Sequence, residues 1–226
     1  MIFQTQFFMR KFLAEYAKKE RILFYISWVV KIAIFIVFVT SAFQLKIGTA
    51  ALALIGLLIS FLPSLIEKKF NIIFPPEFEL SIAVFLYASF ILGEIRGFYG
   101  FFPWWDVLLH GISGILFGLI GFTIVYSLYY THKVVFAPIF AVIFSFTFAL
   151  AMGALWEIFE FAVDQLFSTN MQTSGLVDTM WDLIIDSIGA LIISISGYFY
   201  LKGGDSFLMD RFVKKFIYLN RKFLKK

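Results

Sequence analysis

The sequence predicts an all-α membrane protein, a polytopic bundle of about six transmembrane helices, and three observations support this. Of its 226 residues, 61% are hydrophobic and only 15% are charged, whereas water-soluble domains carry about a quarter charged residues. Apolar runs long enough to cross a bilayer recur along the chain. These runs are continuous and lack the alternation of a transmembrane β-barrel. We therefore expect residues 1–226 to form a single integral-membrane domain.

Composition also excludes several classes of function. The chain has no cysteine, so disulfides, thiolate nucleophiles and cysteine-bound zinc or iron–sulfur centres are excluded. The formal net charge of +4 combines two basic ends with an acidic middle. That distribution does not indicate a nucleic-acid partner, and we expect membrane lipids to be the main surroundings.

The first expected elements are a surface helix and a span. Residues 1–20 alternate between basic and apolar types, which predicts an amphipathic helix lying on the membrane surface. The first span runs from about 22 to 42 and contains Lys31. This lysine either extends to the nearer interface or forms a buried ion pair with an acidic residue.

The second and third spans follow closely. The second runs from about 47 to 66, with Pro63 near its end. The third runs from about 78 to 96 and ends at Glu94 and Arg96. An aromatic stretch rich in Trp and Tyr follows, which is typical of the headgroup level.

Three longer runs complete the bundle. The fourth runs from about 104 to 130 after Pro103, a residue suited to a first helical turn. Small residues on it would let a neighbouring helix approach closely: Gly111, Gly114, Gly118 and Gly121. The fifth and sixth runs cover about 134–167 and 178–201. The tail, 202–226, is again amphipathic and basic.

The positions of Lys and Arg predict the orientation. With six spans, both chain ends, the Lys68–Lys69 loop and the Lys133 turn lie on one side. The opposite loops hold Lys46 and Arg96 as their basic residues. Positive residues favour the cytoplasmic side, so we expect both termini to be cytoplasmic.

Ionisable residues recur at helical spacing inside the last three apolar runs. Residues three or four apart share a helix face, so each run presents one polar stripe. The stripes are Asp106 and His110, then Glu157, Glu160 and Asp164, then Asp178, Asp182 and Asp186. Because such groups are unfavourable in lipid, we expect the stripes to face one another. They would line an acidic cavity open to the outer side, with Glu94 and Arg96 at its edge.

A purely structural interpretation competes for some of these residues. Asp106 and Asp178 lie at helix N-termini, where a carboxylate caps free N–H groups and meets the positive end of the helix dipole. The three acids of the fifth run lie near a helix C-terminus, where the dipole disfavours anions, so capping does not explain them. His110 alone could be a hydrogen-bonded packing residue.

The excess of acids suggests a metal. They cannot all stay ionised in a low-dielectric pocket, so we expect some to be protonated, paired with Arg96, or bound to a divalent cation. Carboxylates with one imidazole suit Mg²⁺, Mn²⁺, Fe²⁺ or Zn²⁺. The candidate ligands are Asp106, His110, Glu157, Glu160 and Asp182.

Several short motifs together resemble a known family. They are Gly93-Glu-Ile-Arg-Gly-Phe-Tyr99, Trp105-Asp106-x-x-x-His110, Glu157-x-x-Glu160, and Asp178-x-x-Trp181-Asp182 before the apolar Gly189-Ala190 helix. Over residues 78–201 the chain resembles the YjdF-type bacterial inner-membrane proteins of unknown function. It is more distantly similar to the VanZ-like family, which is linked to glycopeptide-antibiotic resistance. The resemblance implies a bacterial or archaeal cytoplasmic-membrane protein and no particular reaction.

Two functions, and a third non-catalytic one, follow as hypotheses. The first is a metal-assisted enzyme acting on a lipid or lipid-linked headgroup, with His110, Glu157 and Asp182 as catalytic residues and His110 or Glu157 as general base. The second is a cation- or proton-coupled transporter, because acid–His chains within membranes are typical of proton relays. The third is a protein that only binds a lipid or an antibiotic.

Overall fold

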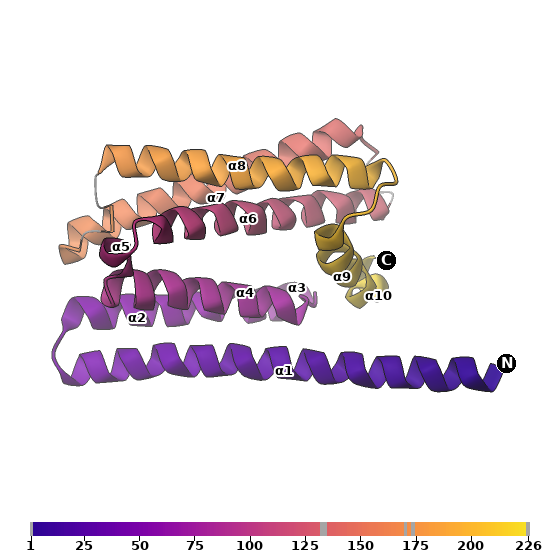
Figure 1. Ribbon diagram of the computed structural model, residues 1–226, viewed down its shortest axis with the longest axis horizontal. Coiled ribbons are helices and arrows are strands. Elements are labelled where there is room, and N and C mark those ends of the chain that lie inside the picture. The colour runs from indigo at the N-terminus through magenta and orange to yellow at the C-terminus, as the bar shows by residue number, and fades with distance from the viewer. Residues whose placement is uncertain (1, 132–134, 170, 173–174, 225–226) are drawn as a thin grey trace.

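The computed structural model describes residues 2–131, 135–169, 171–172 and 175–224, and its regular structure over those ranges is helical throughout (Figure 1). Six helical segments are long and apolar enough to cross a membrane, as the sequence predicts. They are Lys18–Phe43, Ile47–Phe70, Pro76–Ile95, Trp104–Tyr130, Pro138–Phe167 and Leu176–Leu201. The six spans are therefore confirmed by length and composition.

The first helix, α1 (Ile2–Phe43), is one helix of 42 residues. Residues 2–17 continue the axis of the first span and extend past the neighbouring helices (Figure 1). This differs from the predicted separate helix on the membrane surface. Nothing in this stretch breaks a helix, because Pro and Gly are absent before residue 43.

The second and third spans each contain a change in helix geometry. The second consists of α2 (Ile47–Ser60) and α3 (Leu62–Phe70), which meet at Phe61 just before Pro63. The third consists of α4 (Pro76–Leu86) and a π-helix, η1 (Tyr87–Ile95). Wide helical turns of this kind are rare and often occur beside functional sites.

The last three spans follow a short helix, α5 (Phe98–Phe101). They are α6 (Trp104–Tyr130), α7 (Pro138–Phe167) and α8 (Leu176–Leu201). Helix α7 begins at Pro138, not near 134, because proline is favoured in the first turn and residues 135–137 lie outside the helix.

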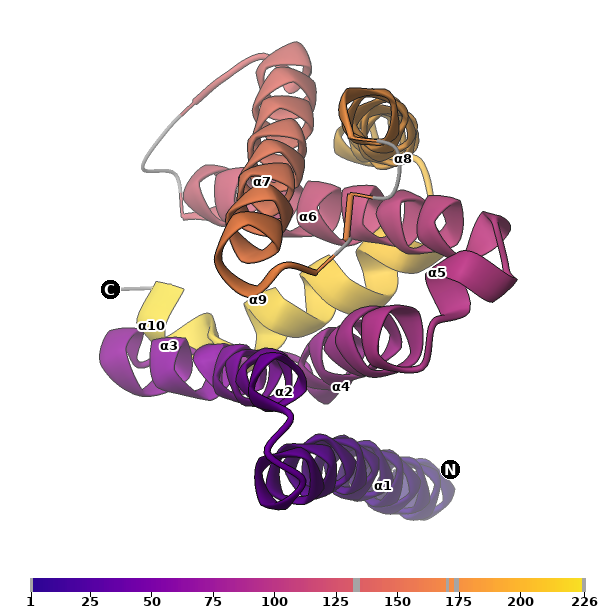
Figure 2. The same ribbon diagram turned by 90° about the vertical axis from the view of Figure 1, so that its left-hand side faces the viewer.

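The helices form two groups. Helices α1–α4 with η1 make the amino-terminal group, and α6–α8 make the carboxyl-terminal group (Figures 1 and 2). Helices α6 and α8 pack closely because Gly114 and Gly189 have no side chains. A side chain on Gly114 would collide with the Asp186 carbonyl, and one on Gly189 would collide with the Gly111 carbonyl. Three of the small residues that the sequence singled out, Gly111, Gly114 and Gly118, thus lie at this contact.

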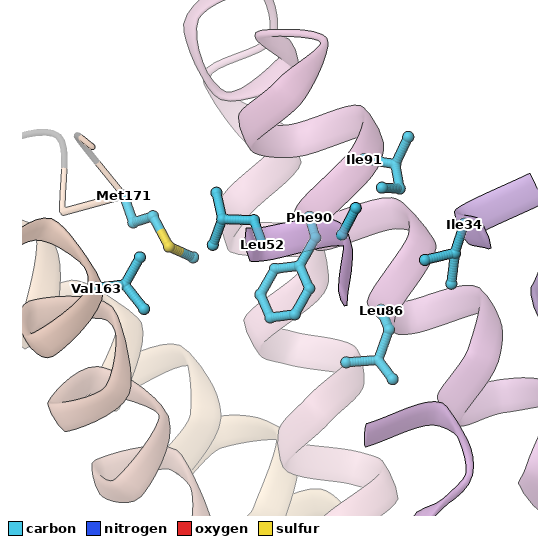
Figure 3. Close-up of a cluster of buried hydrophobic side chains, with 8 residues drawn as sticks. Ile34, Leu52, Leu86, Phe90, Ile91, Val163 and Met171 are labelled. Carbon is cyan, nitrogen blue, oxygen red and sulfur yellow. The ribbon is translucent and has the colours of Figure 1, made fainter. Parts of the chain in front are cut away.

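The bundle has two distinct ends. The α1–α2 connection, α5 and the α7–α8 connection lie at one end, here called the site end. The start of α1 and the last helices lie at the other, the termini end (Figure 1). The two groups meet near the site end in an apolar cluster drawn in Figure 3. Its labelled members are Ile34, Leu52, Leu86, Phe90, Ile91, Val163 and Met171.

The carboxyl-terminal segment joins the groups at the termini end. It comprises η2 (Met209–Lys214), α9 (Lys215–Leu219) and α10 (Arg221–Leu224), and Figure 2 shows it between α6 and the amino-terminal helices. Met209 and Val213 are fully buried in a cluster with residues of α6. The tail is helical, as predicted, and its apolar side packs against protein.

The side chain of Lys31 is buried, 2% exposed, and pairs with Glu79 of α4. Its ammonium also lies 4.7 Å from the centre of the Phe61 ring. The lysine therefore does not extend to the interface, and the buried ion pair is the alternative that the structure supports.

Candidate functional site

His110 lies one turn into α6 at the site end, and its side chain is 5% exposed. Its Nε2 atom faces one carboxylate from each of the three carboxyl-terminal helices. The distances are 3.7 Å to Asp106 Oδ1, 3.8 Å to Glu157 Oε1 and 4.0 Å to Asp182 Oδ1. The stripes predicted on α6, α7 and α8 therefore converge on one point.

The other ring nitrogen of His110 has its own partner. Nδ1 lies 3.2 Å from Asp186 Oδ2, and the Ser113 hydroxyl donates to Asp186 Oδ1 at 2.6 Å. A carboxylate only accepts hydrogen bonds, so a neutral imidazole carries its proton on Nδ1 and directs the Nε2 lone pair toward the three facing acids. Histidines that bind metals are oriented by a carboxylate in this way.

A glycine on α7 leaves room for the Asp186 carboxylate beside His110. A side chain at Gly153 would collide with the Asp186 carboxylate, so only glycine leaves room for it there. Asp186 itself is 1% exposed. Three helices therefore fix the position of the carboxylate that orients His110.

Two acids beside His110 have oxygens with no hydrogen bond among the described residues. These atoms are Glu157 Oε1 and Asp182 Oδ2, on residues 4% and 3% exposed. The second oxygen of Glu157 lies 3.4 Å from the Gln172 amide nitrogen, which also donates to Thr179 at 2.8 Å. Buried polar atoms normally have a partner, so these two oxygens are available to a cation or a hydrogen-bond donor.

Glu160 lies at the edge of the group. Trp156 Nε1 donates to its Oε1 at 2.9 Å, and the Trp156 ring stacks on Phe90 of η1 with 5.6 Å between ring centres. The π-helix thus supports the tryptophan that orients this carboxylate. Of the group around His110, Asp106 is the most accessible, with 23% of its side chain exposed.

The other predicted lining residues have different surroundings. Asp164 accepts hydrogen bonds from Thr169 and from the backbone N–H groups of Met171 and Gln172, at 2.6, 2.8 and 3.0 Å. It therefore holds the connection that follows α7. Asp178 is half-buried in the first turn of α8.

Glu94 and Arg96 lie away from His110. Glu94 is half-buried and lines a separate cavity of about 310 Å³ with Lys46 and Thr169. Arg96 is exposed at the end of η1, and in the described part of the chain no ion pair joins it to the acids around His110. The predicted pairing with Arg96 therefore does not neutralise the group.

The residues around His110 suit a divalent cation. Five carboxylates gather around one imidazole: Asp106, Glu157, Glu160, Asp182 and Asp186. In two sets, Asp106–His110–Asp182 and His110–Glu157–Glu160, the possible ligand atoms lie within 4.8 Å of one another. Ligands around a tetrahedral ion at about 2.1 Å are roughly 3.4 Å apart, so a small contraction of the 3.7–4.0 Å distances would accommodate one.

Four residues of the site were not identified from the sequence. Ser113 lies three positions after His110, so helical spacing could have indicated it. Trp156 also stands four positions before Glu160 on the same face. Gly153 and Gln172 carry no signal, because their roles depend on how α7 sits against α8.

Six apolar spans and a buried acid–His group define a multi-pass helical membrane protein. The chain belongs to the family described as "Predicted membrane protein (DUF2238)", whose match covers residues 26–203. That match is consistent with the YjdF-type resemblance and extends it to the first two spans. An uncharacterised protein of Thermotoga maritima is 31% identical over 133 residues, which are 57% of this chain and 66% of that protein. No solved structure matches.

Proposed function

We propose that this protein binds a divalent cation between α6, α7 and α8 and uses it in a reaction on a lipid or lipid-linked headgroup. The observation that carries the proposal is the placement of His110. One ring nitrogen contacts Asp186, and the other faces Asp106, Glu157 and Asp182. An imidazolium alone leaves the group negatively charged, and uncompensated buried charge costs several kcal/mol.

The residues around His110 divide into metal ligands, an orienting carboxylate and a general base. Asp106, His110, Glu157 and Asp182 are the proposed ligands, Asp186 orients His110, and Glu160 stays outside the ligand set. A bound divalent ion would polarise a substrate oxygen or lower the pKa of a water molecule. With His110 as a ligand, a glutamate becomes the better general base, and Glu160 is held for that role by Trp156.

The location favours a substrate at the membrane surface. The group lies within about three turns of the site end of α6 and α8, and Asp106 gives it access. If the basic residues mark the cytoplasm, the site faces the outer leaflet and both termini are cytoplasmic. The more distant VanZ-like resemblance stays a prediction.

Metal analysis of the detergent-purified protein tests the proposal. We expect about one divalent ion per chain in the wild type and at least a tenfold loss in His110→Ala and Asp182→Asn. Asp205→Asn is the matched control, because this aspartate is exposed beyond α8. Wild-type protein without stoichiometric metal after reconstitution with Zn²⁺, Mn²⁺ or Mg²⁺ would overturn the metal centre.

Turnover is tested separately by incubating the metal-loaded protein with a total lipid extract and following headgroup products by mass spectrometry. We expect products that depend on His110 and are unaffected by Asp205→Asn. Stoichiometric metal without any product would instead support a non-catalytic binding protein.

One observation favours the transporter as a second candidate. Below Asp186, the buried hydroxyls of Ser194 and Ser145 form a further polar layer, in which Ser194 donates to Ser145 at 3.1 Å and Ser145 donates to the Gly118 carbonyl at 2.7 Å. Polar groups therefore continue from the acids around His110 toward the termini end of the bundle. Cation or proton flux into proteoliposomes that Glu157→Gln abolishes would favour this function over the enzyme.

A further inference from the structure

A cavity of about 740 Å³ lies at the termini end, and its described lining includes none of the residues around His110. Its walls come from the start of the first span in α1, the first turn of α4, and the carboxyl-terminal segment. Cavities of this size hold small ligands. Since the third membrane span begins at its wall, at Pro76, we place the cavity at headgroup depth.

One wall of the cavity is acidic around a buried lysine. Lys215, 7% exposed, lies 3.1 Å from Glu20 Oε1 and 2.8 Å from Glu77 Oε2. Two carboxylates thus share one ammonium here. The Glu20 Oε1 atom is turned toward Lys215, but 30% of the Glu20 side chain is exposed, so its other carboxylate oxygen can accept a hydrogen bond from a ligand.

The opposite rim is basic. Lys19 is exposed, and Arg211 has 49% of its side chain exposed. The guanidinium of Arg211 lies 3.8 Å from Glu77, too far for a hydrogen bond. A third cation, Lys214, is already paired with Asp210 at 2.5 Å. Lys19 and Arg211 are therefore the cations best placed to receive an anion.

The cavity also has an apolar side. Ile22 and Leu23 of α1 line it, and Ile22 is 46% exposed on the membrane-spanning part of that helix. A ligand with a hydrocarbon chain could follow this surface toward the bilayer. A free phosphate or a soluble headgroup would leave it uncovered.

We propose that this cavity binds the headgroup of an aminophospholipid. The phosphate contacts Arg211 and Lys19, the primary ammonium donates to Glu20, and an acyl chain lies along Ile22 and Leu23. A wholly anionic headgroup would meet Glu20 and Glu77 unfavourably. A choline headgroup has no N–H to donate to Glu20. The site is independent of the proposed metal centre.

The test is native mass spectrometry of the full-length protein in detergent, titrated with dioleoyl phosphatidylethanolamine, phosphatidylcholine or phosphatidylglycerol. We expect the ethanolamine lipid to bind at least tenfold more tightly than either of the others. Arg211→Gln should weaken binding of the ethanolamine and choline lipids alike. Glu20→Gln should remove the preference between them. Lys202→Gln, an exposed cation outside the cavity, is the control.

Equal binding of the ethanolamine and choline lipids, or unchanged binding in Arg211→Gln, would overturn the proposal. A further titration with glycerophosphoethanolamine, the headgroup without acyl chains, distinguishes a lipid ligand from a free headgroup. If this compound bound as tightly as the ethanolamine lipid, the acyl contact and the lipid ligand would both be ruled out. Glu20 and Arg211 are partly exposed, so both variants should fold, which their melting temperatures will check. The metal content of Arg211→Gln should equal that of the wild type, which keeps this result separate from the metal centre.

Discussion

The two helix groups both bury ionisable side chains, but they neutralise them differently. In the amino-terminal group the buried Lys31 pairs with Glu79, and the half-buried Glu77 pairs with Lys215 of the carboxyl-terminal segment. In the carboxyl-terminal group five carboxylates surround His110, with no lysine or arginine paired to them over the described ranges. Ion pairs such as these can be purely structural. The excess of carboxylates around His110 instead suggests that a ligand from outside the chain neutralises them.

Breaking the pair in the amino-terminal group should have the largest effect. Lys31→Met leaves the half-buried Glu79 without its partner, and we expect it to lower the free energy of unfolding by about 3 kcal/mol. The double variant Lys31→Met/Glu79→Gln should recover most of this loss. Denaturant titration in micelles measures it, with Lys46→Met, at an exposed lysine, as the control. A loss below about 1 kcal/mol for the single variant would contradict the comparison.

Disturbing the orienting carboxylate should have the next largest effect. Gly153→Ala places a methyl group against the Asp186 carboxylate, so His110 should lose its orientation. We expect metal affinity to fall about 10–100-fold, as for other outer contacts of metal ligands, while the helices still form. Isothermal titration measures it, and Gly48→Ala, where nothing lies within 4 Å, is the control. Unchanged affinity would show that Asp186 does not orient the ligand.

Neutralising one acid near His110 should increase the stability of the protein, whereas the loss of Lys31 should decrease it. In metal-free protein, Asp182→Asn removes repulsion between carboxylates, and we expect a gain of about 1 kcal/mol in stability, a common result at functional sites. Thermal unfolding in excess chelator measures it. If the variant were destabilised as strongly as Lys31→Met, the charges around His110 would be structural.

The smallest effect should come from Tyr99 in α5, whose hydroxyl lies 2.9 Å from the Ser89 hydroxyl. Tyr99→Phe should cost about 1 kcal/mol of stability. Burial raises the pKa of Tyr99 well above its usual range, so the phenol stays neutral in the folded protein. Because it is also neutral in the unfolded chain below about pH 10, the loss should be constant from pH 6 to 9. A loss that varies across that range would show that Tyr99 titrates.

The sequence predicted the spans well because apolar length alone determines them. It located the group around His110 because acids at i, i+3 and i+4 spacing must share a helix face. It offered a buried ion pair of Lys31 as one alternative but did not identify the partner, Glu79, which is 48 positions away. It did not predict the pair of Lys215 with Glu77, 138 positions apart. Those pairs depend on which helices become neighbours, and hydropathy carries no such information.

The helical pattern of the sequence also gave wrong predictions for two helix boundaries and for the role of one acidic residue. Pro138 delays the start of α7, and the lack of any breaker in residues 2–17 lets α1 continue straight. Asp164 was expected to line the site because it continues the stripe of Glu157 and Glu160. Its carboxylate instead accepts hydrogen bonds from the backbone of the following connection.

The position of the carboxyl-terminal segment has a consequence for biogenesis. Asn220 accepts from the Ile73 N–H at 2.7 Å and donates to the Ile73 carbonyl at 2.8 Å. Because Asn220 follows the last hydrophobic stretch in the chain, it leaves the ribosome after all six stretches. The seam between the two groups at that end must therefore close late, once the translocon has released the last stretch.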